Sequence, residues 1–193
     1  KVKHLVGAFL CVLGCYACSS PKTEVQSPDG HIKMTLTVDE NGKPFYNVSV
    51  DDSLLIENSA MGFTAANGII LAEGFQVKNT TFSSEDETWT QPWGENKKNR
   101  NHYNEMAVSL TNEDQVQLTL RFRVFDDGIG FRYEYTVPTV DSLLITDELT
   151  TFHFHRDGTS WSIPASAETY ELLYQQQPIS EVETANTPFT FKT

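Results

Sequence analysis

Cysteine is scarce in this sequence, and the three cysteines present, Cys11, Cys15 and Cys18, all lie near the N-terminus. The rest of the chain can therefore form neither a disulfide framework nor a cysteine-based metal site. Long apolar runs are lacking as well. The apolar stretch from Leu5 to Gly14 is shorter than the roughly 20 residues that a membrane-spanning helix needs.

Positive charge is also in short supply, since 14 lysines and arginines stand against 26 acids and give a net charge of −12. Residues 1–17 contain Lys1 and Lys3 and no acid, so without them the net charge becomes −14. This balance disfavours nucleic acid and anionic membranes as partners, because phosphates require a basic surface. It suits neutral or cationic ligands.

The N-terminus has the composition of a secretory signal peptide over residues 1–18. Lys1 and Lys3 precede the apolar run, which ends in small residues around Ala17 and Ser19. A buried N-terminal strand or helix is the alternative. We expect export to the periplasm, either as a released protein or as a lipoprotein anchored to the outer membrane through Cys18 or Cys15.

No long segment shows a helical period, whereas alternation of apolar and polar residues recurs along the chain. This alternation is typical of half-buried antiparallel strands and predicts an all-β fold, an antiparallel β-sandwich. Turns are expected at Asn41-Gly42 and at Asp126-Asp127-Gly128. The clearest alternating segments are 32–38, 46–50, 106–110, 116–124 and 131–137.

Three further predictions concern the second half of the chain. Phe152 and Phe154 mark another strand, and residues 167–175 form a short helix. Residues 188–193 alternate like a strand that is cut off midway, so we expect a fragment of a longer protein. Residues 22–193 then make up one domain.

The stretch from Asp86 to Glu105 is the most unusual, since it holds Trp89, Trp93, four acids, Arg100 and His102 without strand alternation. Indole rings stack on the C–H faces of sugars, and nearby carboxylates and amides bind hydroxyls, so the composition favours carbohydrate binding. The alternative is a long surface loop whose tryptophans plug one end of the sandwich.

Other candidates for chemistry are weaker. His153 and His155 have the spacing to share one face of a strand and bind a metal, but such pairs are more often inert. Carboxylates that could bind calcium also have an explanation in turn chemistry; they are Asp126, Asp127, Asp147 and Glu148. Glu87, Glu95 and Glu105 are candidates for an acid/base pair, but the sequence does not place them in a pocket.

Several segments, taken in order, resemble the N-terminal domain of glycoside hydrolase family 97. The resemblance covers nearly everything after the predicted signal peptide. The segments are Ser-Pro-Asp-Gly at 27–30, Asp-Glu-Thr-Trp at 86–89, Pro-Trp-Gly-Glu at 92–95, Arg-Asn-His-Tyr-Asn-Glu at 100–105, the run from Phe125 to Glu134, Trp-Ser-Ile-Pro-Ala at 161–165 and Ala-Asn-Thr-Pro at 185–188.

This resemblance implies an exported, calcium-dependent α-glucosidase or α-galactosidase of a Gram-negative bacterium. Its N-terminal domain would be a super-sandwich of the galactose-mutarotase-like class that walls part of the active-site pocket and packs on a (β/α)8 catalytic barrel. That barrel, absent from this chain, supplies the catalytic acids. The glutamate that would bind calcium falls just beyond Thr193, so no catalytic residue and no metal ligand are expected here.

The resemblance also favours a substrate-binding or barrel-contacting role for the tryptophan-rich stretch. Residues expected to serve it are Trp89, Trp93, Glu95, Arg100, Asn101, His102, Asn104 and Glu105. The partners implied are an α-linked oligosaccharide and the barrel of the same polypeptide. Two alternatives remain: a stand-alone carbohydrate-binding envelope lipoprotein, and a purely structural envelope protein. The first alternative expects Trp93 to bind sugar directly. A bland role also stays open, in which these residues only bond one another and hold the shape of the loop.

Overall fold

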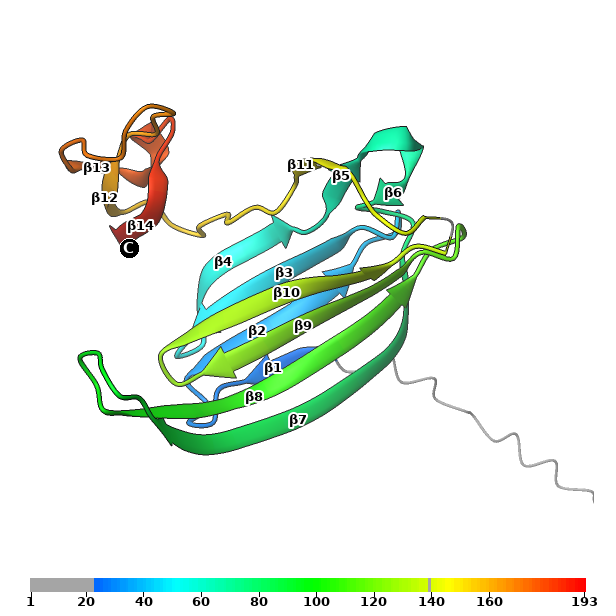
Figure 1. Cartoon of the computed structure of the whole chain (residues 1–193), viewed down its shortest axis with the longest axis horizontal. Coiled ribbons are helices and arrows are strands. Elements are labelled where there is room, and N and C mark those ends of the chain that lie inside the picture. Colours follow the sequence, from blue (N-terminus) through cyan, green and yellow to red (C-terminus); the bar gives the residue numbers. More distant parts are fainter. Residues whose placement is uncertain (1–22, 139) are drawn as a thin grey trace, which may run out of the picture.

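The computed structural model describes residues 23–138 and 140–193, so the predicted signal peptide and its cysteines lie outside the described residues (Figure 1). The fold is almost entirely β, as the alternation predicts. The strands are β1 (Glu24–Gln26), β2 (Ile32–Val38), β3 (Pro44–Val50), β4 (Ser53–Ala60), β5 (Phe63–Ala65), β6 (Ile70–Leu71), β7 (Gln76–Thr90), β8 (Lys98–Thr111), β9 (Gln117–Phe125), β10 (Gly128–Thr136), β11 (Ile145–Glu148), β12 (Thr159–Ile163), β13 (Gln175–Pro178) and β14 (Asn186–Lys192), with two 3-10 turns, η1 (Ala66–Gly68) and η2 (Ile179–Glu181).

Two four-stranded antiparallel sheets form a sandwich, which confirms the predicted fold class. One sheet has the order β1-β2-β3-β4 and the other β10-β9-β8-β7. Figure 1 shows the first sheet lying behind the second, with the strands of the two sheets running in nearly the same direction. This is the aligned type of sheet packing. Strand β1 and strand β7 are therefore edge strands.

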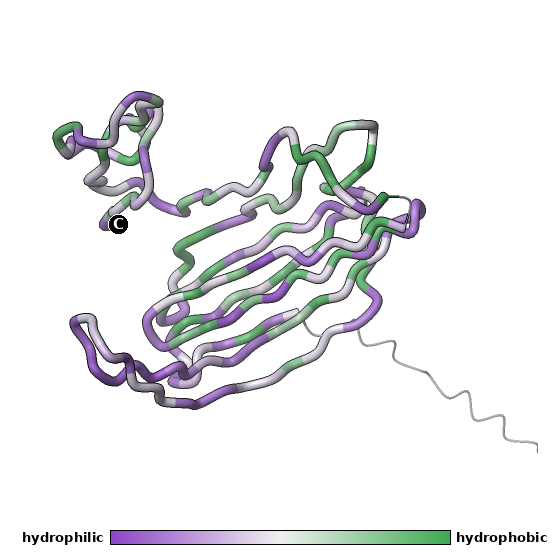
Figure 2. Tube along the Cα trace, viewed as in Figure 1, coloured by the Kyte–Doolittle hydropathy of each residue, from purple (hydrophilic) through white to green (hydrophobic). Residues whose placement is uncertain are grey.

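The core lies between the sheets because alternate side chains of each strand point inward. Buried apolar residues come from both sheets, among them Met34 and Leu36 of β2 and Leu118, Leu120 and Phe122 of β9. Aromatic rings join the sheets where Tyr46 of β3 meets Phe131 of β10, 5.5 Å between ring centroids. In Figure 2 the apolar residues concentrate on these central strands.

Both predicted hairpin turns are present. The Asp39 carboxylate accepts the backbone N–H groups of Asn41 and Lys43, and Gly42 adopts a φ of +75°, which glycine tolerates better than other residues. The Asp126-Asp127 turn joins β9 to β10, with Phe125 paired to Gly128.

A second group of strands lies beside the sandwich. Strands β11, β5 and β6 form one three-stranded sheet, and β13, β12 and β14 form another near the C-terminus. The segment leading to β12 is held to β4 by backbone hydrogen bonds from Glu57 to His153 and from His155 to Leu55. Phe154 contacts Phe191 of β14, 4.1 Å between centroids, so a small aromatic cluster links this sheet to the sandwich.

Two local predictions are wrong. Residues 167–175 form no helix; most of them are irregular, and the last begins β13. Four apolar side chains there, Tyr170, Leu172, Leu173 and Tyr174, are exposed, so no packed face stabilises a helical turn. The expected strand at Phe152 and Phe154 reduces to one isolated bridge between Phe154 and Ile56.

The stretch from Asp86 to Glu105 also differs from the irregular region expected, since most of it is paired in a long hairpin. Strands β7 and β8 pair continuously from Thr81–Ala107 to Thr90–Lys98. Because both faces of this hairpin carry polar side chains, its sequence lacks the apolar–polar alternation from which strands are predicted. Among residues 23–138 and 140–193, no helix is long and apolar enough to cross a membrane.

Candidate functional site

The β7–β8 hairpin extends past the rest of its sheet and carries all eight predicted site residues on or between its strands. Pairing of β8 with β9 begins only at Tyr103–Phe125, so residues 98–102 pair with β7 alone. Figures 1 and 2 show this hydrophilic extension projecting from one end of the sandwich. Since side chains two apart share a side of a strand, Arg100, His102 and Asn104 lie on one side of β8.

Arg100 makes the clearest ion pair of this extension. Its Nε and Nη2 donate to the two carboxylate oxygens of Asp86 at 2.7 and 2.8 Å, a bidentate arrangement. The hydrogen bond from Arg100 lowers the pKa of Asp86, and the same contact raises the pKa of Arg100. The pair braces β7 against β8 and holds Asp86 ionised.

His102 lies next in the row and faces the β9–β10 turn. Its Nδ1 is buried, has no hydrogen-bond partner among the described residues, and lies 3.5 Å from Oδ2 of Asp126. Asp126 also accepts the backbone N–H of Asp29 at 2.9 Å. Asp126 thereby links the β9–β10 turn to Asp29, which lies 97 residues earlier in the sequence, and brings both turns into one group of side chains.

The Ser27–Gly30 turn completes the group. Asp29 accepts hydrogen bonds from the Ser27 hydroxyl at 2.6 Å and from the His31 backbone at 3.0 Å, and these bonds lower its pKa. Asn104 donates to the Gln26 carbonyl at 2.9 Å. We refer to Asp29, Asp86, Arg100, His102, Asn104 and Asp126 as the polar end of the sandwich.

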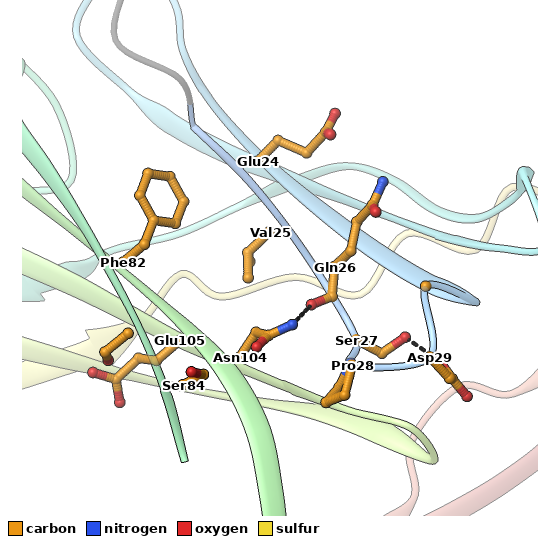
Figure 3. Close-up of a pocket in the computed structure, with 12 residues that line it drawn as sticks. Glu24, Val25, Gln26, Ser27, Pro28, Asp29, Phe82, Ser84, Asn104 and Glu105 are labelled. Carbon is orange, nitrogen blue, oxygen red and sulfur yellow. Dashed lines mark hydrogen bonds between the residues drawn. The ribbon is translucent and has the colours of Figure 1, made fainter. Parts of the chain in front are cut away.

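A groove opens beside the polar end, between edge strand β1, the Ser27–Gly30 turn and strands β7 and β8 (Figure 3). Its volume is about 700 Å³, within the range of small-molecule sites. Phe82, 52% exposed, supplies an apolar surface, and Ser83, Ser84 and Asn104 supply hydroxyl and amide groups. Glu24 and Asp29 also line the groove and add carboxylates. An aromatic face beside hydroxyl, amide and carboxylate groups is suited to a sugar ring.

The other side of β8 carries Asn101 and Glu105. Asn101 donates to Glu87 at 3.1 Å across the hairpin. Glu105 is 7% exposed and accepts from Arg121 at 2.6 Å and from Arg123 at 2.7 Å. Burial alone would raise the pKa of Glu105, but the two arginines outweigh it and lower the pKa.

The remaining predicted residues lie at the tip of the hairpin. Trp89 is 50% exposed on β7, Trp93 is 83% exposed in the loop of residues 91–97, and Glu95 is exposed in the same loop. Gln91 shapes this loop by donating its Nε2 to the Asn96 carbonyl at 2.8 Å. The tip therefore offers two indole rings to a partner and keeps neither in the core.

Sequence reasoning did not include Asp29, Asp86, Ser27 or Phe82 among the site residues. Asp29 and Asp86 lie in the segments that carry the family resemblance, so their positions in those segments were the available signal. Asp126 was considered only as a calcium ligand or turn residue. Its role in linking His102 to the Ser27–Gly30 turn depends on a register that no single segment reveals.

The acids and the histidine of the polar end are not gathered into a metal centre. Across residues 23–138 and 140–193, no three histidine, cysteine or acidic side chains gather in a group that could hold a metal ion. His155 pairs with Glu57, Nδ1 to Oε2 2.7 Å, and so is tied to β4. The described residues therefore offer calcium no group of three such side chains, and the expectation that its ligands lie beyond Thr193 stays a prediction.

Comparison with known proteins gives consistent matches. Residues 25–193 match the family described as Glycosyl-hydrolase 97 N-terminal. A retaining alpha-galactosidase of Bacteroides thetaiotaomicron is 28% identical over 133 residues, which cover 68% of this chain and 19% of that protein.

Solved structures agree. A glycoside hydrolase family 97 enzyme from Pseudoalteromonas sp. strain K8, solved with panose and with acarbose, has a TM-score of 0.81 and 36% identity. The match covers 88% of this chain and 26% of that enzyme. A beta-arabinopyranosidase shares the fold, with a TM-score of 0.69, 24% identity, and coverage of 79% of this chain and 26% of that one. This chain thus spans about a quarter of the length of these structures.

Proposed function

Because this chain belongs to the Glycosyl-hydrolase 97 N-terminal family, we propose that it is the non-catalytic N-terminal part of an exported α-glycosidase acting on an α-linked oligosaccharide. In this proposal the domain packs on a (β/α)8 catalytic barrel of the same polypeptide and walls part of the active-site pocket. The observation that carries the proposal is the convergence at the polar end of the Ser27–Gly30, Asp86–Trp89, Arg100–Glu105 and Phe125–Glu134 segments.

The hydrogen bonds of the carboxyl groups suit positioning better than proton donation, both at the polar end (Asp29, Asp86) and elsewhere in the described residues. A glycosidase requires a carboxylic acid whose pKa is raised so that it can protonate the leaving group. The carboxyls with displaced pKa values in the described part of the chain are all displaced downward; they are Asp29, Asp86, Glu105, Glu134 and Asp157. Each of these is held as an ionised hydrogen-bond acceptor.

Calcium remains part of the proposal for the parent enzyme, with its ligands outside this chain. Export through the N-terminal segment, with or without lipid on Cys18 or Cys15, is proposed on the composition of residues 1–18. Neither glucoside nor galactoside specificity is assigned, since that choice depends on the residues around the reacting carbon.

The first test is an activity assay on the purified chain. We expect no hydrolysis of p-nitrophenyl α-glucoside or α-galactoside. Turnover that is lost in Asp86→Asn would refute a non-catalytic role. In the parent enzyme, Arg100→Gln should lower kcat/KM at least about tenfold. Lys78→Gln removes the same charge from the neighbouring strand β7, far from the hairpin tip, and should leave kcat/KM unchanged.

A stand-alone carbohydrate-binding protein is the second candidate, and the exposure of Trp93 favours it. It predicts that panose or galactosides shift the tryptophan fluorescence of the isolated chain and that Trp93→Ala removes the shift. Trp93→Ala should not change folding, because the side chain is largely in solvent. A shift in the isolated chain would favour this candidate, and an absence of any shift would count against it.

A further inference from the structure

The outer face of the second sheet carries a cluster of arginines that the proposed function does not use. Three of the five arginines in the chain, Arg121, Arg123 and Arg132, surround a hollow over Gly130. The concentration is unusual in a chain whose net charge is −12. The hollow has a volume of about 190 Å³, roughly that of six water molecules.

The strand register creates this hollow. Gly130 of β10 pairs with Arg123 of β9, and Arg132 pairs with Arg121, so the three arginines flank the glycine on one side of the sheet. A Cβ built on Gly130 would meet no atom within 4 Å, which leaves open space above the backbone. Phe125, two residues after Arg123, forms an apolar wall.

The two glutamates beside the hollow neutralise only part of this charge. Arg121 uses three of its five N–H donors for these acids, because it donates to Glu105 and, through Nε and Nη2, to Glu134 at 3.0 and 3.2 Å. Three guanidinium groups and two carboxylates leave one positive charge in the group. The excess resides on Arg123 and Arg132, which line the hollow.

Those two arginines keep donors available. Arg123 uses Nε for Glu105 and lies over the Tyr103 ring, 4.4 Å from its centroid, so its orientation is fixed. Its two terminal nitrogens have no protein acceptor among the described residues. Arg132 pairs with Glu134 through Nη2 at 2.6 Å, and its other nitrogens likewise have no acceptor within the described ranges.

From this arrangement we propose that the hollow over Gly130 is a binding site for the carboxylate of an acidic monosaccharide unit, a uronic acid. Guanidinium groups recognise carboxylates through paired, charge-assisted hydrogen bonds. The carboxylate lies between Arg123 and Arg132, and an apolar C–H face of the ring lies against Phe125. This site is separate from the polar end and does not depend on the proposed function.

The test is an NMR titration of the isotope-labelled chain with sodium D-glucuronate. Sodium acetate and D-glucose serve as comparison ligands at matched ionic strength. We expect glucuronate to shift the Gly130 amide and the Nε–H signals of Arg123 and Arg132 in a saturable way, acetate to bind several-fold more weakly, and glucose to leave these signals unchanged. Added salt should weaken binding, because the site is exposed.

Variants separate the hollow from general charge effects. Arg132→Gln should weaken glucuronate about tenfold or more, whereas Lys78→Gln, an equal change in net charge elsewhere on the surface, should not. Gly130→Val fills the hollow without changing charge and should abolish binding. Thr136→Val, on the same side of β10 but outside the hollow, should retain it.

Three results would overturn the assignment: no saturable shift with glucuronate, equal binding of acetate and glucuronate, or equal weakening by Arg132→Gln and Lys78→Gln. None involves hydrolysis of a glycoside, so failure here leaves the proposed function unaffected. Thermal unfolding of each variant establishes that the fold is intact. If Gly130→Val does not fold, Arg132→Gln decides the question, because Arg132 is largely exposed and Glu134 keeps Arg121 as a partner.

Discussion

Glu105 shows how one buried acid can organise a surface. It is 7% exposed, yet both of its oxygens accept from arginines on the neighbouring strand, and Arg121 extends the chain of contacts to Glu134 on the strand beyond. A buried charge is tolerated only when it is paired in this way. Glu105 therefore fixes the relative positions of three strands.

Glu105→Gln should lower the free energy of unfolding by about 1–3 kcal/mol, since two charge-assisted hydrogen bonds become weaker. Glu134→Gln should cost less, because its side chain is more exposed. Urea denaturation of both variants against the parent chain measures the difference. Equal, negligible effects would contradict this account.

The lowered pKa of Glu105 gives this prediction a pH dependence. A depressed folded-state pKa contributes stability that is fully present above the unfolded-state value, near 4.5, and is lost as the pH falls through the folded-state pKa. The stability difference between the parent and Glu105→Gln should therefore shrink below about pH 4.5. A difference that stays constant down to pH 3 would show that the carboxylate charge is not its source.

The sequence indicated several site residues but not their pairing. Arg100, His102 and Asn104 could be named from composition and resemblance, and they lie together at the polar end. Glu105 was grouped with them because it is adjacent in sequence, but β8 places its side chain on the opposite side, where it bonds arginines. Contacts such as Asp126 with Asp29 depend on the stacking of two sheets, which local patterns do not specify.

At the scale of the elements, turns differ in how much space they leave for a side chain at a left-handed glycine. Gly42 and Gly68 have similar left-handed φ angles, +75° and +72°. A Cβ on Gly42 would lie 2.3 Å from the backbone nitrogen of Phe75, whereas one on Gly68 would meet nothing within 4 Å. The β2–β3 turn is thus packed against the segment before β7.

Gly42→Ala should destabilise the chain by at least about 1 kcal/mol more than Gly68→Ala. Both variants place a residue with a side chain in the left-handed region, which lowers the free energy of unfolding by about 1–2 kcal/mol. Only Gly42→Ala also forces the Gly74–Phe75 backbone to move. Chemical denaturation of the two variants makes the comparison. Equal losses of stability would mean that the turn can shift freely.

Elements with period-two alternation and a buried face were predictable from sequence, as β2, β3, β9 and β10 show. The extension of β7 and β8 was not, because both faces of residues 86–90 and 98–102 are polar and no core selects a register there. The helix expected over residues 167–175 failed for the opposite reason. Its apolar residues suggested a packed face, but in the structure they remain exposed.

At the scale of the whole molecule, buried apolar residues are concentrated in the sandwich. None of the buried hydrophobic core residues in the described part of the chain comes from β12, β13 or β14, where the buried residues are Ser160 and Ser162. Regions with little buried apolar surface open more easily than the core. The C-terminal sheet and the sandwich should therefore differ in local stability.

Native-state hydrogen exchange should show this difference. Backbone amides of β12 and β14 are expected to open with a free energy at least about 2 kcal/mol below that of amides in the centre of β8 and β9. Leu120→Ala, which removes core packing, should lower the protection of β8 and β9 amides and serves as the control for global unfolding. Equal protection across both regions would indicate a single cooperative unit.

The extended β7–β8 hairpin also has a mechanical meaning. Five residue pairs, from Asp86–His102 to Thr90–Lys98, project beyond the last pairing with β9, a reach of roughly 17 Å at the rise of a strand. The sheet holds this arm only at its base, and the Arg100–Asp86 ion pair stiffens it along its length. A change in the twist of β8 at the base therefore changes the position of the tip. Trp93 lies at the tip of this arm and is 83% exposed, so the place of its indole ring follows from the orientation of the part of β8 that the sheet holds.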